Sequence, residues 1–139
     1  VTITGGIFIF CVGQVIQRFV LEPIQDLKKT IGEIRFRLNY YADMHPSEFE
    51  TAPAVLKERI AIASEAFRES ALRLETQSAV IPCYDLFELI FRLPKRADLD
   101  TIKRHLIFIS NTFFETNPDE RKERRRQSGE VKQLLRFTP

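Results

Sequence analysis

Residues 1–21 constrain the fold of this chain more strongly than any other segment. They include no acidic residue and a single basic residue, Arg18, whereas charged residues are frequent in the rest of the chain. About twenty apolar residues in an α-helix are enough to cross the hydrocarbon core of a bilayer. We therefore expect residues 1–21 to form one transmembrane helix. The alternative is a buried core helix, because a mean hydropathy of -0.18 for the whole chain suits either environment.

The residues that flank this segment predict its orientation. No basic residue stands before it in the sequence, whereas Lys28, Lys29, Arg35 and Arg37 follow it. Because an excess of Lys and Arg stays on the cytoplasmic side, we expect the N-terminus outside and the C-terminal domain in the cytoplasm, at a bacterial inner membrane. The flanks do not match a secretory signal peptide, which needs a basic region before the apolar stretch and a small-residue cleavage site after it. The sequence opens on Val1, so we expect further residues to precede it.

One stripe of the apolar segment is poorly suited to lipid. Gly6, Gly13 and Gln17 recur at helical spacing, and Gln14 and Arg18 lie beside them. Small residues allow close approach of two helices, and a glutamine amide in hydrocarbon needs a hydrogen-bonding partner. We expect these five residues to contact copies of the same helix or the helices of a larger membrane protein. A narrow pore lined by Gln14 and Gln17 is one alternative, and the other places Gln17 and Arg18 at the headgroups.

The chain after residue 21 has a helical pattern. Pro23 favours the first turn of a helix, and residues 22–43 are expected to form a juxtamembrane amphipathic helix. Its apolar stripe recurs at three- and four-residue steps and consists of Ile24, Leu27, Ile31, Ile34 and Leu38. Prolines and short polar side chains predict a loop over 44–53, with Thr51 as an N-cap. We expect residues 53–139 to form one cytoplasmic helical domain.

Four helices are predicted within that domain. They cover 53–76, 83–93, a segment that starts near 98 or 100, and a last helix that starts at Asn117-Pro118 and runs to about 137. The buried side of 53–76 is expected to comprise Val55, Leu56, Ile60, Ile62, Ala63, Ala66, Phe67, Ala71 and Leu74. The third segment is expected to bury Ile102, Leu106, Ile109 and Phe113, with Ile107, Phe108 and Phe114 widening that face. No strand-like alternation is found. The predicted fold is all-α, with one N-terminal transmembrane helix followed by a cytoplasmic bundle of four or five helices.

Residues with catalytic chemistry are sparse. Cys11 and Cys83 are too few for a disulfide scaffold and fit free thiols in a reducing compartment. His45 and His105 are far apart, with no other ligand at metal-binding spacing, so we expect no metal site. Glycine-rich phosphate loops and nucleophile elbows do not occur. We predict a protein that is not an enzyme and that holds no cofactor.

The densest cluster of positive charge comprises Arg121, Lys122, Arg124, Arg125 and Arg126. Such a cluster attracts anionic lipid headgroups at about 1 kcal/mol for each base, or it binds an acidic partner. A solvated helix face is the alternative, because Asp and Glu residues offset part of the charge. Binding of nucleic acid is the least expected, because the net charge of the chain is only +2 and no aromatic residues interleave with the bases.

Several short motifs resemble those of small uncharacterised bacterial single-pass membrane-anchored helical proteins. The shared features are Gly13-Gln14 with Glu22-Pro23-Ile24, the step Gly32-Glu33-Ile34, and Pro94-Lys95-Arg96. The resemblance implies the same architecture and no particular activity.

Three functions fit these observations. We expect a single-pass membrane subunit or interaction protein whose cytoplasmic helical domain docks a partner or self-associates. The first alternative is an oligomeric channel-forming effector that is gated by its cytoplasmic domain. The second is a membrane-tethered domain that binds nucleic acid or a nucleotide through the basic last helix.

Overall fold

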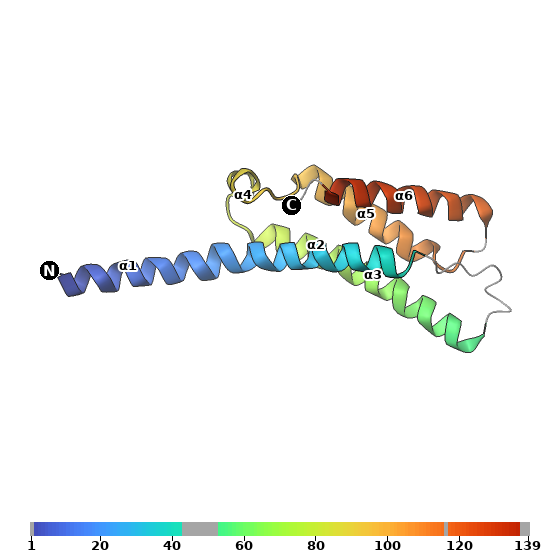
Figure 1. Ribbon diagram of the computed structural model, residues 1–139, viewed down its shortest axis with the longest axis horizontal. Helices are drawn as coiled ribbons and strands as arrows, with labels where there is room; N and C mark the ends of the chain where they lie inside the picture. Colours follow the sequence, from blue (N-terminus) through green and yellow to red (C-terminus); the bar gives the residue numbers. More distant parts are fainter. Residues whose placement is uncertain (1, 43–52, 116, 137–139) are drawn as a thin grey trace.

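The computed structural model describes residues 2–42, 53–115 and 117–136, and every regular element in these ranges is helical. In chain order the elements are α1 (Thr2–Ile16), a π-helical turn η1 (Gln17–Leu21), α2 (Glu22–Tyr40), α3 (Ala54–Val80), α4 (Tyr84–Phe91), α5 (Arg96–Thr112) and α6 (Pro118–Arg136). The predicted all-α fold is confirmed: one long apolar N-terminal helix is followed by a helical bundle (Figure 1). The predicted loop over 44–53 and its cap Thr51 lie almost wholly outside the described residues.

The helices α1 and α2 form one continuous rod through the π-helical turn η1 (Figure 1). The backbone N–H of Glu22 donates to the carbonyl oxygen of Gln17, five residues earlier instead of four. Pro23, which follows, has no N–H to donate, and its ring crowds the carbonyl of the preceding turn. The wider turn relieves that crowding. Pro23 therefore widens the helix locally and does not end it, so the chain leaves α1 and enters α2 without a break.

Four helices, α2, α3, α5 and α6, surround one hydrophobic core (Figure 1). α3 packs between α2 and α5, and α6 closes the bundle against α5 and α2. The predicted stripe of α2 is confirmed, since all five of its residues are buried. They share one core with residues of α3, α5 and α6, so α2 packs as part of the bundle.

Small side chains bring α3 and α5 close together. Ala63 and Ala71 of α3 are fully buried, and the hydroxyl of Ser64 donates to the backbone carbonyl of Ser110 in α5 at 2.9 Å. A buried hydroxyl without such a partner would be costly. The four central residues of the predicted α5 face, Ile102, Leu106, Ile109 and Phe113, are buried, but Ile107 and Phe114, which were expected to widen it, are exposed. On α3, however, Val55 and Ile62 are exposed, because the buried side rotates toward Ser64 and Ser70.

The short helix α4 lies outside the four-helix bundle, at the end that is nearest α1 (Figure 1). It is seen almost end-on while α1 runs across the page, so the two axes cross at a steep angle. Cys83 and Arg92, at its two ends, have positive φ angles of 47° and 51° and turn the chain into and out of the helix. Tyr84 anchors α4, because its buried hydroxyl donates to the carbonyl of Pro94 at 2.7 Å.

Candidate functional site

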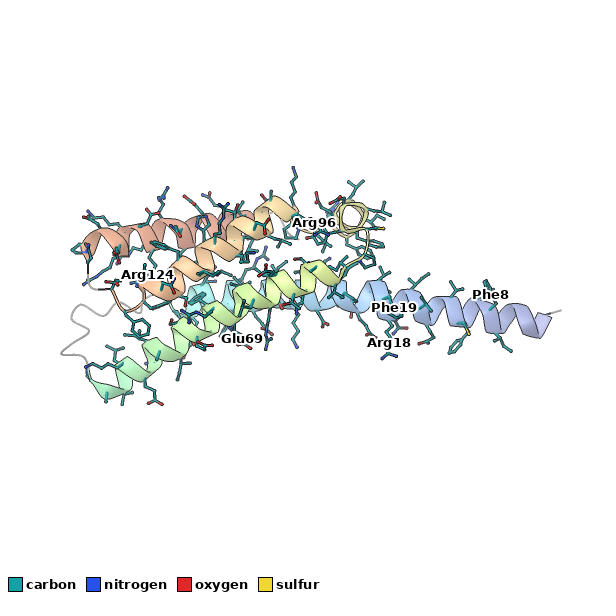
Figure 2. The ribbon with its side chains drawn as sticks, turned by 180° about the vertical axis from the view of Figure 1, so that it is seen from behind. Phe8, Arg18, Phe19, Glu69, Arg96 and Arg124 are labelled. Atoms are coloured by element: carbon teal, nitrogen blue, oxygen red, sulfur yellow. The ribbon has the colours of Figure 1, made fainter. Side chains whose placement is uncertain are left out.

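The apolar helix α1 projects from the bundle with its side chains exposed. Phe8 and Ile9 are 71% and 74% exposed, and Phe10 and Phe19 are similarly open. Figure 2 shows Phe8 and Phe19 on the part of the rod that extends away from the other helices. One helical stretch, Gly5–Tyr40, is long and apolar enough to cross a membrane. A core helix of a soluble domain would bury such side chains, whereas here the chain itself covers almost none of them.

The predicted contact stripe lies on this projecting rod. Gly6, Gly13 and Gln14 belong to α1, and Gln17 and Arg18 belong to η1. All five are exposed, and a Cβ atom added at Gly6 or Gly13 would meet no atom of the chain within 4 Å. Packing within the described part of the chain therefore does not account for these glycines. The stripe remains a predicted contact surface for another helix.

The predicted basic cluster is divided between the outer face of α6 and the interior of the bundle. α6 carries all five residues, and consecutive residues of a helix point in different directions around its axis. Lys122, Arg125 and Arg126 are exposed, Arg121 is partly buried, and Arg124 is buried with 5% of its surface exposed. The expectation that Arg124 binds lipid or a partner across an outer face is corrected by this placement.

Arg126 is held by acidic neighbours on its own helix. Its guanidinium contacts the carboxylates of Glu123 and, at 3.4 Å, of Glu130. Hydrogen bonds from Arg126, then from Gln127, lower the pKa of Glu123 to about 2. Arg126 is therefore paired with acidic residues of its own helix, in exposed ion pairs that contribute little to stability.

Arg124 instead points its guanidinium toward the end of α5. Its Nη1 donates to the carbonyl oxygen of Thr112 at 2.6 Å, and the guanidinium carbon lies 5.1 Å from the centre of the Phe113 ring. Thr112 is the last residue of α5, and its carbonyl oxygen also accepts the backbone N–H of Glu115 at 3.2 Å, so Arg124 adds a second donor at this helix end. Burial, and then the charges of Arg121 and Arg125, lower the pKa of Arg124 below its ordinary value.

A pocket of about 510 Å³ opens beside Arg124, among α2, α3, α5 and α6. Its apolar side is formed by Leu38, Phe67, Ile109 and Phe113, and its basic side by Arg124, Arg125 and Lys132. Tyr41, Ala42, Ser128 and Gly129 complete the lining, so no acidic side chain of the described residues takes part. An apolar cavity with a few convergent polar groups is the usual form of a small-molecule site.

Sequence reasoning missed this pocket, although one signal pointed to it. Val131 and Leu135 of α6 are fully buried, and the same helical stripe continued backward passes through Ser128 and Arg124. Arg124 therefore lies on the buried side of α6, although a charged residue is expected on the exposed side. Lys132 and Tyr41 join the site only through tertiary packing of α6 against α2.

His105 and the two cysteines are the other residues whose chemistry the sequence singled out. His105 lies between α5 and α6, with Nδ1 3.0 Å from Oε1 of Gln127 and Nε2 3.2 Å from a carboxylate oxygen of Glu130. Cys11 and Cys83 are both exposed free thiols. Within the ranges that the structure describes, no group of three or more His, Cys, Asp or Glu side chains could hold a metal ion. His45 lies outside the described residues.

Comparison with family models, with curated proteins and with solved structures finds no match to this chain.

Proposed function

We propose that this chain is a non-enzymatic single-pass membrane protein whose helical bundle docks a partner or self-associates on the cytoplasmic face of a bacterial inner membrane. The exposed apolar surface of α1 is the observation that carries the proposal. Phe8, Ile9 and Phe10 each expose about two thirds or more of their surface, on a helix that leaves the bundle. Lipid tails would cover that surface at no cost in backbone hydrogen bonds, since a helix satisfies its own.

The position of α4 supports the same arrangement. Its outward side carries Leu86, Leu89 and Ile90, which are 57%, 82% and 58% exposed, while Phe87 and Phe91 pack against the core. α4 lies across the direction of α1 at the end of the bundle nearest to it (Figure 1). A short apolar helix in that position lies flat in the membrane interface when α1 spans the bilayer. We propose that lipid covers this face of α4.

Membrane extraction tests the role of α1. The variant Ile9→Arg plus Val12→Arg places two charges near the middle of α1, each costing about 2.5 to 3.5 kcal/mol in insertion. We expect the wild-type chain to resist extraction by alkaline carbonate and the variant to be released. The matched control, Val55→Arg plus Ile62→Arg, changes two exposed apolar residues of α3 and should stay with the membrane. Release of the wild type, or equal release of both variants, contradicts the proposal.

A single tryptophan tests the position of α4, because the chain contains none of its own. Leu89→Trp places the reporter on the outward side of α4, and Val55→Trp is the control at the opposite end of the bundle. In vesicles of brominated phosphatidylcholine we expect strong quenching of the first fluorophore and little quenching of the second. Equal quenching of both would place α4 away from the lipid.

The orientation is tested with the native Cys83, in a Cys11→Ser background. A membrane-impermeant maleimide should label this exposed thiol in lysed cells and leave it unlabelled in intact cells whose outer membrane has been permeabilised. Labelling in those intact cells would reverse the proposed topology.

The mass of the particle in detergent separates a subunit from the channel alternative. A ring of several identical copies favours the channel, and one copy beside other chains favours the subunit.

In either case Gln14→Leu plus Gln17→Leu should weaken the assembly, because interhelical hydrogen bonds of this kind contribute about 0.5 to 2 kcal/mol. Unchanged assembly in that variant would remove the stripe from the interface. The nucleic-acid alternative would have to use the three exposed bases Lys122, Arg125 and Arg126, because Arg124 is buried.

A further inference from the structure

The pocket beside Arg124 combines an unneutralised buried charge with an apolar wall. Only 5% of the surface of Arg124 is exposed. Its Nη2 atom is buried and has no hydrogen-bond acceptor among the described residues. A buried cation without a carboxylate partner is normally destabilising. The contacts of Arg124 with the Thr112 carbonyl and the Phe113 ring use Nη1 and the face of the guanidinium, and they leave Nη2 without an acceptor among the described residues.

The residues around Arg124 add further positive charge to the pocket. Arg125 and Lys132 line the same pocket, and the residues of the described chain that line it include no Asp or Glu. Arg121 and Arg125 act on Arg124 as like charges. An anion placed in the pocket would accept a hydrogen bond from Nη2 of Arg124, which has no acceptor among the described residues, and charge-assisted bonds of this kind are among the strongest in proteins.

The opposite wall would hold an apolar group. The ring of Phe67 stacks on that of Phe113 with centroids 5.6 Å apart, and Tyr41 meets Phe67 edge-on at 5.9 Å. The aromatic cluster and the basic residues line one cavity of about 510 Å³, which is within the range of small-ligand sites of about 300 to 1,000 Å³.

Gly129 leaves open space at the edge of the pocket. It lies inside α6, where glycine costs about 1 kcal/mol relative to alanine. A Cβ atom at this position would meet nothing within 4 Å, so close packing does not require glycine there. Gly129 lines the pocket, so the open space beside its Cα adjoins the cavity.

From these observations we infer that the pocket binds a small soluble anion with an aromatic or alkyl body, whose phosphate or carboxylate contacts Arg124, Arg125 and Lys132 and whose body packs on Phe67 and Phe113. The anion is not a headgroup of the membrane that holds α1, because Arg124 lies toward the end of the bundle that is remote from Phe8 and Arg18 (Figure 2). The inference uses no property of α1, so it stands or falls independently of membrane insertion.

The test is titration calorimetry on the full chain in nanodiscs of zwitterionic phosphatidylcholine, with 1-naphthyl phosphate as the probe. We expect saturable binding that weakens with added salt, and weaker binding of inorganic phosphate, which lacks the apolar body. Arg124→Met keeps the length of the side chain and removes the charge, and it should weaken binding about tenfold or more. Lys122→Met removes an exposed base from the same helix outside the pocket and should leave the affinity within about twofold of the wild type.

Gly129→Phe keeps Arg124 and fills the cavity. We expect it to abolish binding while the circular dichroism spectrum stays that of the wild type, which separates occlusion from unfolding. The inference is overturned if the wild type shows no saturable binding, if Arg124→Met and Lys122→Met bind equally, or if Gly129→Phe binds like the wild type.

Discussion

The hydroxyl of Tyr84 offers a sharp test of how α4 is attached to the bundle. Tyr84 is 1% exposed and donates to the carbonyl of Pro94, and the guanidinium of Arg96 lies 4.7 Å from the centre of its ring. Burial, followed by the nearby charge of Glu88, raises the pKa of Tyr84 from 10.0 to about 12. The neutral hydroxyl is therefore the form that the folded protein prefers.

The sign of the pH dependence follows from this shift. An unfolded Tyr84 loses its proton near pH 10, whereas the folded one keeps it until about pH 12. The stabilisation is fully present below pH 10 and is lost as the pH rises from about 10 to about 12. At about 1.36 kcal/mol for each pKa unit, the free energy of unfolding falls by about 2.7 kcal/mol over that interval.

Tyr84→Phe isolates this contribution, because phenylalanine keeps the ring and cannot ionise. Near neutral pH the variant should be less stable than the wild type by about 1 to 3 kcal/mol, since the Pro94 carbonyl loses its partner. Urea unfolding, followed by circular dichroism at a series of pH values, should show this difference shrinking to zero or reversing by about pH 12. A constant difference across the series would refute the assigned burial of the hydroxyl.

Two further predictions concern the bundle. Phe67→Ala removes the ring that lies between Tyr41 and Phe113. The substitution should lower the free energy of unfolding by about 3 to 5 kcal/mol in the same urea assay. A loss below about 1 kcal/mol would contradict the packing described. Asn117→Ala removes the side-chain oxygen that accepts the N–H of Asp119 at 3.0 Å and should cost about 0.5 to 2 kcal/mol. Asn39→Ala, at an exposed position in α2, is the control. Equal stability of these two asparagine variants would show that Asn117 does not cap α6.

The helices were largely predictable because their signals are local. The apolar stripe of α2, the buried face of α5 and the start of α6 at Asn117 and Pro118 follow from side-chain spacing and capping chemistry. Each depends on residues within a few turns of one another. The continuous passage from α1 to α2 was less predictable, because Pro23 can either start a helix or widen one.

The candidate pocket could not be predicted in the same way. Its residues come from four helices, and only tertiary packing brings Tyr41 of the α2 end beside Lys132 of α6. The exposure of Val55 and Ile62 has the same origin, since the buried side of α3 is set by contact with α5 through Ser64 and not by hydrophobicity alone. The burial of Arg124 was not predicted from the sequence, because arginine is normally exposed and a lone buried arginine is rare.

The most direct measurement of the central claim uses Cys11, an exposed thiol of α1, in a Cys83→Ser background. A nitroxide attached at Cys11 in the reconstituted full chain reports collisions with molecular oxygen, which concentrates among lipid tails, and with a nickel chelate, which stays in water. If α1 lies among lipid tails, the nitroxide should collide frequently with oxygen and almost never with the chelate. Frequent collisions with the chelate, or few with either reagent, would place α1 in water or inside protein and contradict the account.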